Sequence, residues 1–321
     1  MRHLFLLGLA ALLGSTLGCA TTCIEGANGV TCTAKSLKRF DGAPPQAQAF
    51  NVTPGAPLNI DVQYGNVLVT RSTTPQVIVE FRPFCYAGHD EQATAQQFLT
   101  QNLRMTATGA GAITAVSGRN GGSNGLGADV IVRVPDGFNG AINVLNRGDG
   151  PVNEFGLKIE GVGHATALTA TNQALLGSCW IQGAPSVKST TVQCRNGVSV
   201  FDVSDAVNIT NTDPRHDASS PAITLRMASV SPGSPGGTVT ATSGSVAATF
   251  PRAGGYVIQA QSPVNGAVQE GSVPPSCQLN AAAPNNKTLS CGGGPAYRII
   301  AGAQPDTIGP PPPANVMLSY Q

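Results

Sequence analysis

A short pattern that occurs twice constrains the fold of this chain more than any other feature. Each copy reads as a strand, a proline, a second strand, a glycine turn and a third strand. Proline ends the first strand because it has no backbone N–H to donate to a β-ladder, and glycine suits the tight turn. The aligned pairs are Pro135 with Pro251, Ile142 with Ile258, Gly150 with Gly266, and Val152 with Val268. We therefore expect an all-β fold assembled from a repeated unit.

Short segments of alternating apolar and polar residues recur along most of the chain, with Gly, Pro and Asn turns between them. That alternation is typical of half-buried strands. Many segments are rich in Thr, Ser, Ala and Val, and aromatic residues make up only 5% of the chain. Small side chains suit a β-helix-like solenoid, whose coils pack only on their neighbours, whereas a β-sandwich would carry more large aromatics. We predict a β-solenoid of many short strands, with one short helix over residues 90–102.

The charge balance bears on the class of partner. Lys and Arg number 18 against 17 Asp and Glu, and charged residues make up 11% of the chain. A net charge of +1 gives no electrostatic reason to expect nucleic acid or an anionic membrane surface as a partner. The hydrophobic fraction of 41% also argues against a disordered chain.

The N-terminus has the pattern of an export signal. A short basic start precedes an apolar run from Leu4 to Leu13, which is too short to span a bilayer, and small residues follow. Residues 1–18 are therefore predicted to be a signal peptide. The segment Thr16-Leu17-Gly18-Cys19 resembles the lipobox of bacterial lipoproteins, although Thr16 stands where leucine is usual. The resemblance implies a lipid anchor at Cys19, and the alternative is cleavage near Ala20 with free secretion.

Export makes disulfide bonds the expected state of the cysteines. Three close pairs stand out by their spacing, and each would close a short loop worth about 2–3 kcal/mol of stability. They are Cys23 with Cys32, Cys179 with Cys194, and Cys277 with Cys291. Cys85 is left over, either as a buried thiol or as half of a bond to a partner protein. The spacings do not fit a zinc site, so we expect neither a metal nor another cofactor.

Four regions follow from these patterns. The signal peptide, 1–18, precedes a cysteine-containing tether over residues 19–48. The β-solenoid spans residues 49–275. Residues 276–321 hold a disulfide loop, a polyproline spacer and a last strand at Val316–Tyr320, which is expected to dock onto an edge or a cap.

The repeated unit resembles a family of bacterial domains predicted to be adhesins, of the head-GIN-like β-solenoid kind. Turn glycines and alternating valines carry the likeness, which covers roughly residues 49–268. The matching segments are Tyr64–Val69, Ser243–Val246, Phe250-Pro251 and Asn265–Val268. The resemblance implies a secreted or membrane-anchored domain with a role in adhesion, and it supplies no catalytic residue.

The chain carries no H-E-x-x-H or phosphate-loop motif. Its one G-x-S-x-G string, residues 121–125, lies in a Gly-rich loop that no helix pattern follows, so it does not predict a nucleophile elbow. Asp202 and Asp205 come closest to the paired carboxylates of a glycoside hydrolase, which lie about 5–10 Å apart across a cleft. Any two acidic residues near a turn could reach that separation. We therefore predict no enzymatic activity, with a polysaccharide hydrolase or lyase on the same scaffold as the alternative.

Two features are candidates for a binding surface. Arg147-Gly148-Asp149 spells the tripeptide that integrins read, but Gly and Asp also suit a strand-to-strand turn for backbone reasons. Trp180 is the only tryptophan and follows Cys179. Its indole would either pack in the core or offer a flat platform for a sugar ring.

The sequence favours a non-enzymatic interaction module of the cell envelope, held at the outer membrane by a lipid or else secreted. The expected partner is a glycan or an envelope protein, bound by many modest hydrogen bonds from strand-borne Thr, Ser and Asn. A purely structural spacer without a ligand is a second alternative. A groove lined by several acids and a base would favour the enzyme, and uniform polar faces without a pocket would favour the spacer.

Overall fold

The computed structural model describes residues 21–26, 29–34, 37–44, 46–121, 125–152, 154–183, 187–214, 220–303 and 313–321. Side chains are described from residue 37 onward. The predicted signal peptide, Cys19 and the polyproline segment lie outside the described residues.

Within these residues the strands form two twelve-stranded sheets and a separate hairpin of β1 (Thr21–Gly26) and β2 (Gly29–Ala34). We name the large sheets after a central strand of each. In spatial order, the β11 sheet contains β23 (Cys277–Ala283), β24 (Asn286–Cys291), β21 (Tyr256–Gln261), β25 (Ala296–Ile300), β19 (Gly237–Ala241), β17 (Ala206–Asn211), β15 (Ser189–Cys194), β13 (Ala167–Asn172), β11 (Ala141–Asn146), β5 (Leu58–Val62), β9 (Ile113–Arg119) and β8 (Leu103–Thr108). The β12 sheet contains β22 (Val268–Glu270), β26 (Val316–Tyr320), β20 (Val246–Phe250), β18 (Ile223–Ser229), β16 (Val198–Ser204), β14 (Cys179–Gln182), β12 (Leu157–Ile159), β6 (Val67–Arg71), β10 (Leu126–Val134), β7 (Gln76–Gly88) and β3 (Leu37–Asp41), with β4 (Gln46–Asn51) also paired to β7.

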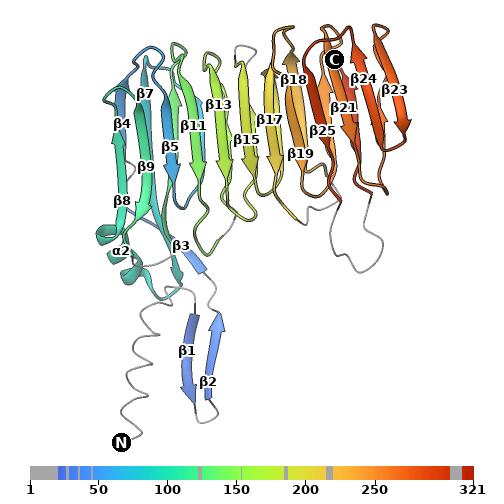
Figure 1. The fold of residues 1–321 in the computed structure, drawn as a ribbon. Helices are drawn as coiled ribbons and strands as arrows, with labels where there is room; N and C mark the ends of the chain where they lie inside the picture. The colour runs from blue at the N-terminus through green and yellow to red at the C-terminus, as the bar shows by residue number, and fades with distance from the viewer. Residues whose placement is uncertain are drawn as a thin grey trace, which may run out of the picture.

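From β9 to β23 successive strands alternate between the two sheets, so one strand from each sheet makes one coil. The coils stack side by side along the molecule (Figure 1). Neighbouring coils pair in parallel, as β13 does with β11 and β15, and as β14 does with β12 and β16. Inward side chains such as Leu168 and Ile181 from the two sheets belong to one continuous core. The predicted all-β solenoid is confirmed, and the core needs only small and medium side chains because each coil packs chiefly on the next.

Two coils are inserted out of sequence order near the ends of the solenoid. In Figure 1 the blue strand β5 lies between the green strands β9 and β11, and the red strand β25 lies between β19 and β21. In the other sheet, β6 likewise separates β10 from β12, and β26 separates β20 from β22. The chain therefore steps over one coil twice, from β10 to β11 and from β20 to β21.

These two steps are the two copies of the repeated sequence pattern. Pro135 directly follows β10, and Pro251 directly follows β20. The third strand of the pattern is confirmed only in the second copy, where β22 begins at Val268. In the first copy Val152 lies in a loop, and β12 begins later, at Leu157.

The last strand is an interior strand, so the expectation that it docks onto an edge or a cap is wrong. β26 pairs in parallel with β20 on one side and with β22 on the other. Its inward residues Val316 and Leu318 are buried in the common core. The position between β20 and β22 is open because the chain steps over it before returning to fill it.

A cap of antiparallel strands and one helix covers the N-terminal end. The long strand β7 pairs with β10, β3 and β4. Helix α2 (Gln92–Gln101) packs Ala95, Phe98 and Leu99 near Phe40 of β3, which confirms the predicted helix. Strand β3 and the first three residues of β4 lie within residues 19–48, which we expected to be tether. Phe40 is the only fully buried residue of β3, so this edge strand reads in the sequence as a polar linker.

Two of the predicted disulfide bonds are confirmed. Cys179 of β14 is bonded to Cys194 of β15, with Cα atoms 6.1 Å apart, so this bond links the β12 sheet to the β11 sheet. Cys277 is bonded to Cys291 across the β23–β24 hairpin, with Cα atoms 4.1 Å apart. The hairpin forms the outermost edge of the β11 sheet at the C-terminal end.

The remaining cysteines with described backbone are Cys23, Cys32 and Cys85. Cys23 and Cys32 are direct backbone partners in the β1–β2 ladder. Their side chains lie outside the described part of the chain, so their bond stays a prediction. Cys85 is a buried thiol whose Sγ lies 3.7 Å from the carbonyl oxygen of Tyr86.

Candidate interaction surfaces

The outward face of the β11 sheet carries two continuous rows of mainly polar side chains, which we call the polar face. Every second residue of a strand points away from the core, and parallel pairing brings these residues into register. The first row is Thr114, Asn59, Asn143, Thr169, Thr191, Asn208, Thr238, Arg298 and Gln259. The second row is Val116, Asp61, Leu145, Thr171, Gln193, Thr210, Thr240, Ile300 and Gln261.

The polar face is regular, shallow and nearly uncharged. Its hydroxyl and amide groups recur about every 4.8 Å across the strands and about every 6.7 Å along them. Asn143 donates a 2.9 Å hydrogen bond from its amide to Asn59 on the next strand. A depression of about 320 Å³ lies over the strands that carry these two residues and Thr169. Such a surface offers repeated donors and acceptors without a deep pocket.

A groove of about 740 Å³ follows the loops that leave the β11 sheet. Its lining repeats from coil to coil, because Arg147, Gln173, Arg195 and Thr212 each follow the last residue of a strand. Leu175 adds an apolar wall. The groove therefore combines two arginines with amide and hydroxyl groups.

Arg147 and Asp149, which the sequence singled out, line this groove and are held by ion pairs. The Arg147 guanidinium donates to both carboxylate oxygens of Asp61, at 2.9 and 2.6 Å. This pairing raises the pKa of Arg147. Asp149 accepts from Gln63 at 2.9 Å and pairs with Arg119 at 3.0 Å. The tripeptide is a braced turn whose two charged side chains both have partners within the molecule.

A ladder of buried asparagines lies where the strands meet the loops of the groove. Each Asn donates from its amide to a loop carbonyl and accepts from the backbone N–H two residues further on. The ladder contains Asn146, Asn172 and Asn211. Cys194 holds the ladder position between Asn172 and Asn211, with its Sγ 3.4 Å from the carbonyl oxygen of Gly177. These bonds satisfy the polar groups of the turns and keep successive loops in register.

Trp180 lies on the outward face of the β12 sheet with 43% of its surface exposed, so it is not a core residue. Its ring centroid is 4.9 Å from that of Phe201 on β16. The Arg226 guanidinium lies 5.2 Å from the Phe201 ring centroid. Gln182 and Asp202 flank these rings, with the Gln182 amide 3.5 Å from the Asp202 carboxylate. We call Trp180, Gln182, Phe201, Asp202 and Arg226 the aromatic platform.

The structure does not bring the sequence-selected residues into one site. Trp180 is on the β12 sheet, whereas Arg147 and Asp149 lie in loops that leave the β11 sheet, and Trp180 does not line their groove. Phe201 and Arg226 were missed in the sequence. The alternation of strand residues between the two faces could have revealed Phe201. If Val198 and Val200 of β16 point inward, Phe201 must point outward.

Asp202 and Asp205, the acidic pair of the enzyme hypothesis, are bound to different partners. Arg226 donates to both carboxylate oxygens of Asp202, at 3.0 and 2.9 Å. Asp205 accepts from the Ser231 backbone N–H at 2.7 Å and pairs with Lys188 at 3.2 Å. Burial opposes ionisation of Asp205, but these partners outweigh it and hold its pKa below the usual value.

The backbone gives both aspartates a local role. Asp202 and Asp205 have φ of 58° and 60°, in the left-handed region that Asp tolerates better than most residues. They flank an irregularity in the pairing of β16 with β18. Both residues allow the chain to bend at this irregularity, and the bonds of their carboxylates stabilise the bend.

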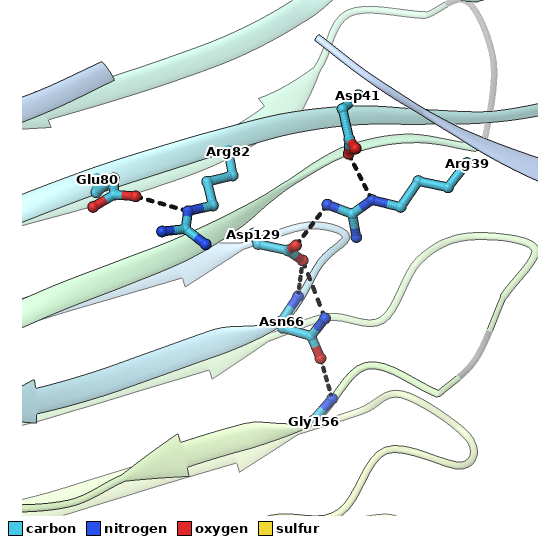
Figure 2. A network of polar contacts seen from close by, with 7 residues as sticks. All are labelled: Arg39, Asp41, Asn66, Glu80, Arg82, Asp129 and Gly156. Carbon is cyan, nitrogen blue, oxygen red and sulfur yellow. Dashed lines mark hydrogen bonds and ion pairs between the residues drawn. The ribbon is translucent and has the colours of Figure 1, made fainter. Parts of the chain in front are cut away.

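A polar network ties β3, the edge strand of the N-terminal cap, to strands further inside the β12 sheet (Figure 2). Arg39 of β3 donates to Asp129 of β10 and to Asp41, both at 2.8 Å. Asp129 also accepts from the backbone N–H of Asn66 at 2.8 Å. The Asn66 side chain in turn accepts from the Gly156 N–H at 3.0 Å. These bonds join the edge strand to β10 and to the residues that directly precede β6 and β12, which is a structural role.

Within the part of the chain that the structure describes, no three His, Cys, Asp or Glu side chains gather as metal ligands. None of the described helices is long and apolar enough to cross a bilayer.

The chain matches no protein-family model and no curated protein. A search of solved structures finds a predicted cell adhesion protein from Clostridium sporogenes, with 10% identity and a TM-score of 0.32, covering 87% of this chain and 100% of that one. A predicted adhesin from Bacteroides fragilis shows 11% identity and a TM-score of 0.27, covering 86% and 97%. One from Parabacteroides merdae shows 10% identity and a TM-score of 0.23, covering 66% and 85%. These TM-scores are too low to carry an argument about this chain.

Proposed function

We propose that this chain is a non-enzymatic adhesion or interaction module of the bacterial cell envelope, and that its polar face binds a glycan or a surface protein. The polar face is the observation that carries the proposal. It extends over neighbouring strands of the β11 sheet in fixed register, and its rows hold hydroxyl and amide groups with only Arg298 and Asp61 charged.

Repetition supplies the binding energy in this proposal. One hydrogen bond contributes only about 0.5–1.5 kcal/mol net, so a surface of this kind needs many of them at once. The parallel ladders hold the strands in register, which lowers the entropy that binding must overcome. A nearly uncharged face also avoids the cost of removing water from unpaired charges. An extended ligand with regularly spaced polar groups fits these properties.

The acidic residues support a role without catalysis. Asp202 and Asp205 are each committed to a basic partner, and Asp205 also holds a backbone N–H. A hydrolase would need two carboxyls facing one cleft with different protonation states. The groove of about 740 Å³ contains Asp149, which is paired with Arg119.

A binding screen tests the polar face. The exported form, lacking the predicted signal peptide and with Cys19 removed, is applied to glycan and envelope-protein arrays. We expect binding that is lost in the triple variant Thr169→Lys, Thr191→Lys and Thr238→Lys, whose changes lie in the first row. The matched control carries Thr249→Lys, Gln269→Lys and Ser319→Lys on the opposite sheet. Normal folding with no binding would refute the interaction role and favour a structural spacer.

We further propose that Cys19 anchors the protein by a lipid at the outer membrane, with free secretion as the alternative. The lipobox-like segment before Cys19 supports this proposal. Growth of expressing cells with a radioactive fatty acid should label the wild-type chain and leave Cys19→Ala unlabelled. A Cys19→Ala variant that keeps the label would refute the anchor, and an unlabelled wild type found in the medium would establish secretion.

A further inference from the structure

We infer that the aromatic platform binds a neutral sugar ring, by stacking of the ring on the Trp180 indole. This inference rests on the proposed interaction role and names a ligand class for a second surface, on the sheet opposite the polar face. Trp180 is exposed, whereas the large aromatics Tyr64, Tyr256, Tyr297 and Phe250 are all fully buried. The core does not use this indole, which forms an exposed aromatic surface together with Phe201, and Trp is enriched at binding interfaces.

The neighbouring strands leave the indole accessible. Trp180 is in register with Ser199 on β16, and the row continues through Thr224 and Ala247. These small side chains form a low shelf beside the indole. Phe201 contacts the indole from the diagonal position, with the two rings tilted by 55°. Phe201 therefore supports the indole on one side, while the small side chains of the neighbouring strands leave space beside it. This arrangement suits a flat ring as a ligand.

Polar groups surround the aromatic surface at positions where a sugar presents its hydroxyls. The Arg226–Asp202 pair is partly exposed, with 41% and 30% of the side-chain surfaces accessible. The guanidinium and carboxylate are therefore open to further hydrogen bonds, and the Gln182 amide lies beside them. A sugar ring offers an apolar C–H face to an aromatic ring and hydroxyls around its edge. The aromatic platform provides an aromatic ring for the C–H face and polar groups for the hydroxyls within one small area.

The charges of the platform favour a neutral ligand over an acidic one. Arg226 is paired with both oxygens of Asp202. Lys158, which is in register with Trp180 on the other side, pairs with Glu160 at 2.9 Å. Each positive group near the indole is thus matched by a carboxylate. An anionic ligand would have to displace one of these partners, whereas a neutral sugar would not.

Intrinsic fluorescence provides a direct test, because Trp180 is the only tryptophan in the chain. The exported form, with Cys19 removed, is titrated with a panel of neutral oligosaccharides and, as a comparison, with acidic ones. We expect a neutral member to shift or quench the emission saturably. Calorimetry should then show that Trp180→Ala weakens binding by about tenfold or more, while Trp180→Tyr retains part of the affinity, because a phenol ring still stacks.

Two further variants separate this inference from the proposed function. Phe201→Leu removes the ring that supports the indole and should weaken sugar binding while the protein stays folded. The Thr169, Thr191 and Thr238 lysine variant should abolish binding at the polar face and leave the fluorescence response unchanged. A folded protein whose Trp180 emission responds to no neutral sugar, or a calorimetric affinity unchanged in Trp180→Ala, would overturn the inference. A response to acidic sugars alone would also overturn it.

Discussion

Tyr297 donates a 2.6 Å hydrogen bond from its hydroxyl to the main-chain carbonyl oxygen of Asp205. The bond spans β19, which lies between the strand of Tyr297 and β17. Gly237 is the residue of β19 in register with Tyr297, and a Cβ at this position would lie 1.8 Å from the carbonyl oxygen of Val207 on β17, so β19 needs glycine here to approach β17. The inserted C-terminal coil is thereby tied to a coil that is not its direct neighbour.

Removal of this hydroxyl should destabilise the protein. Tyr297→Phe leaves a buried carbonyl oxygen without its donor, which costs about 1–3 kcal/mol in the free energy of unfolding. Tyr320→Phe is the matched control, because the buried Tyr320 hydroxyl has no hydrogen-bond partner among the described residues. We expect the control to be neutral or slightly stabilising. Urea unfolding followed by circular dichroism measures both, and equal losses in the two variants would contradict the assigned bond.

The place of Cys194 in the asparagine ladder predicts a partial rescue. Loss of the Cys179–Cys194 bond should cost about 2–4 kcal/mol. Cys179→Ala with Cys194→Asn should then be about 1 kcal/mol more stable than Cys179→Ala with Cys194→Ala. The reason is that an Asn amide at this position can donate to the Gly177 carbonyl, as Asn172 does in its own loop. Thermal unfolding of the two double variants measures this difference. Equal unfolding midpoints would show that position 194 cannot support the hydrogen bonds that Asn172 and Asn211 make at their positions in the ladder.

The lowered pKa of Asp205 predicts a pH dependence. Its carboxylate is favoured in the folded state, where Ser231 and Lys188 hold it, relative to the unfolded state with its ordinary value of 3.8. The stabilisation is therefore complete above that value and is lost as the pH falls through the lower folded-state pKa. Asp205→Asn keeps the left-handed backbone acceptable and should lose about 1–3 kcal/mol at pH 7. Its unfolding midpoint should also depend less on pH in the acid range.

Asp136→Asn serves as the control for the loss of one negative charge. Asp136 forms an exposed ion pair with Arg71, and such pairs contribute about 0–1 kcal/mol. Stability should be measured from neutral to acidic pH in the wild type and both variants. An acid profile of Asp205→Asn that is as steep as the wild-type profile would refute the role of Asp205.

The interior position of β26 predicts that the C-terminus is essential for folding. Deletion of residues 314–321 removes one strand with partners on both sides and opens the core at Val316 and Leu318. We expect the truncated chain to be insoluble or to lack cooperative unfolding. The comparison is excision of the edge hairpin over residues 277–291, whose ends are adjacent. If the truncation were tolerated better than the excision, β26 would not be an interior strand.

Local patterns in the sequence were sufficient to predict the all-β class, most strands and helix α2. Alternation determines which residues of a strand face inward, and turn residues mark its ends. The spatial order of the coils was not predictable in this way. Nothing in Val316–Tyr320 distinguishes an interior strand from an edge strand, because both alternate. That difference depends on partners more than 40 residues away along the chain, such as Val268 and Val246.

The candidate surfaces were predictable to a smaller extent. Trp180 was identified by its rarity, but β14 is four residues long and gave no clear strand signal around it. Phe201 lies 21 residues further on and meets Trp180 only through the parallel pairing of β14 with β16. Arg147 and Asp149 were correctly placed in a turn, while their partners Asp61 and Arg119 come from an inserted coil and from β9. Contacts of this kind depend on the stacking order and not on local pattern.

The inserted coils at the two ends determine how a protein of this design could change in length during evolution. A coil appended after β26 would find both neighbouring positions already filled, by β20 and β22. A coil placed before β5 would meet the same obstacle at β9 and β11. Lengthening by duplication is therefore open only to the middle coils, from β11 to β20, where each strand follows its predecessor in order. Longer and shorter relatives should share both ends and differ in the number of coils between them.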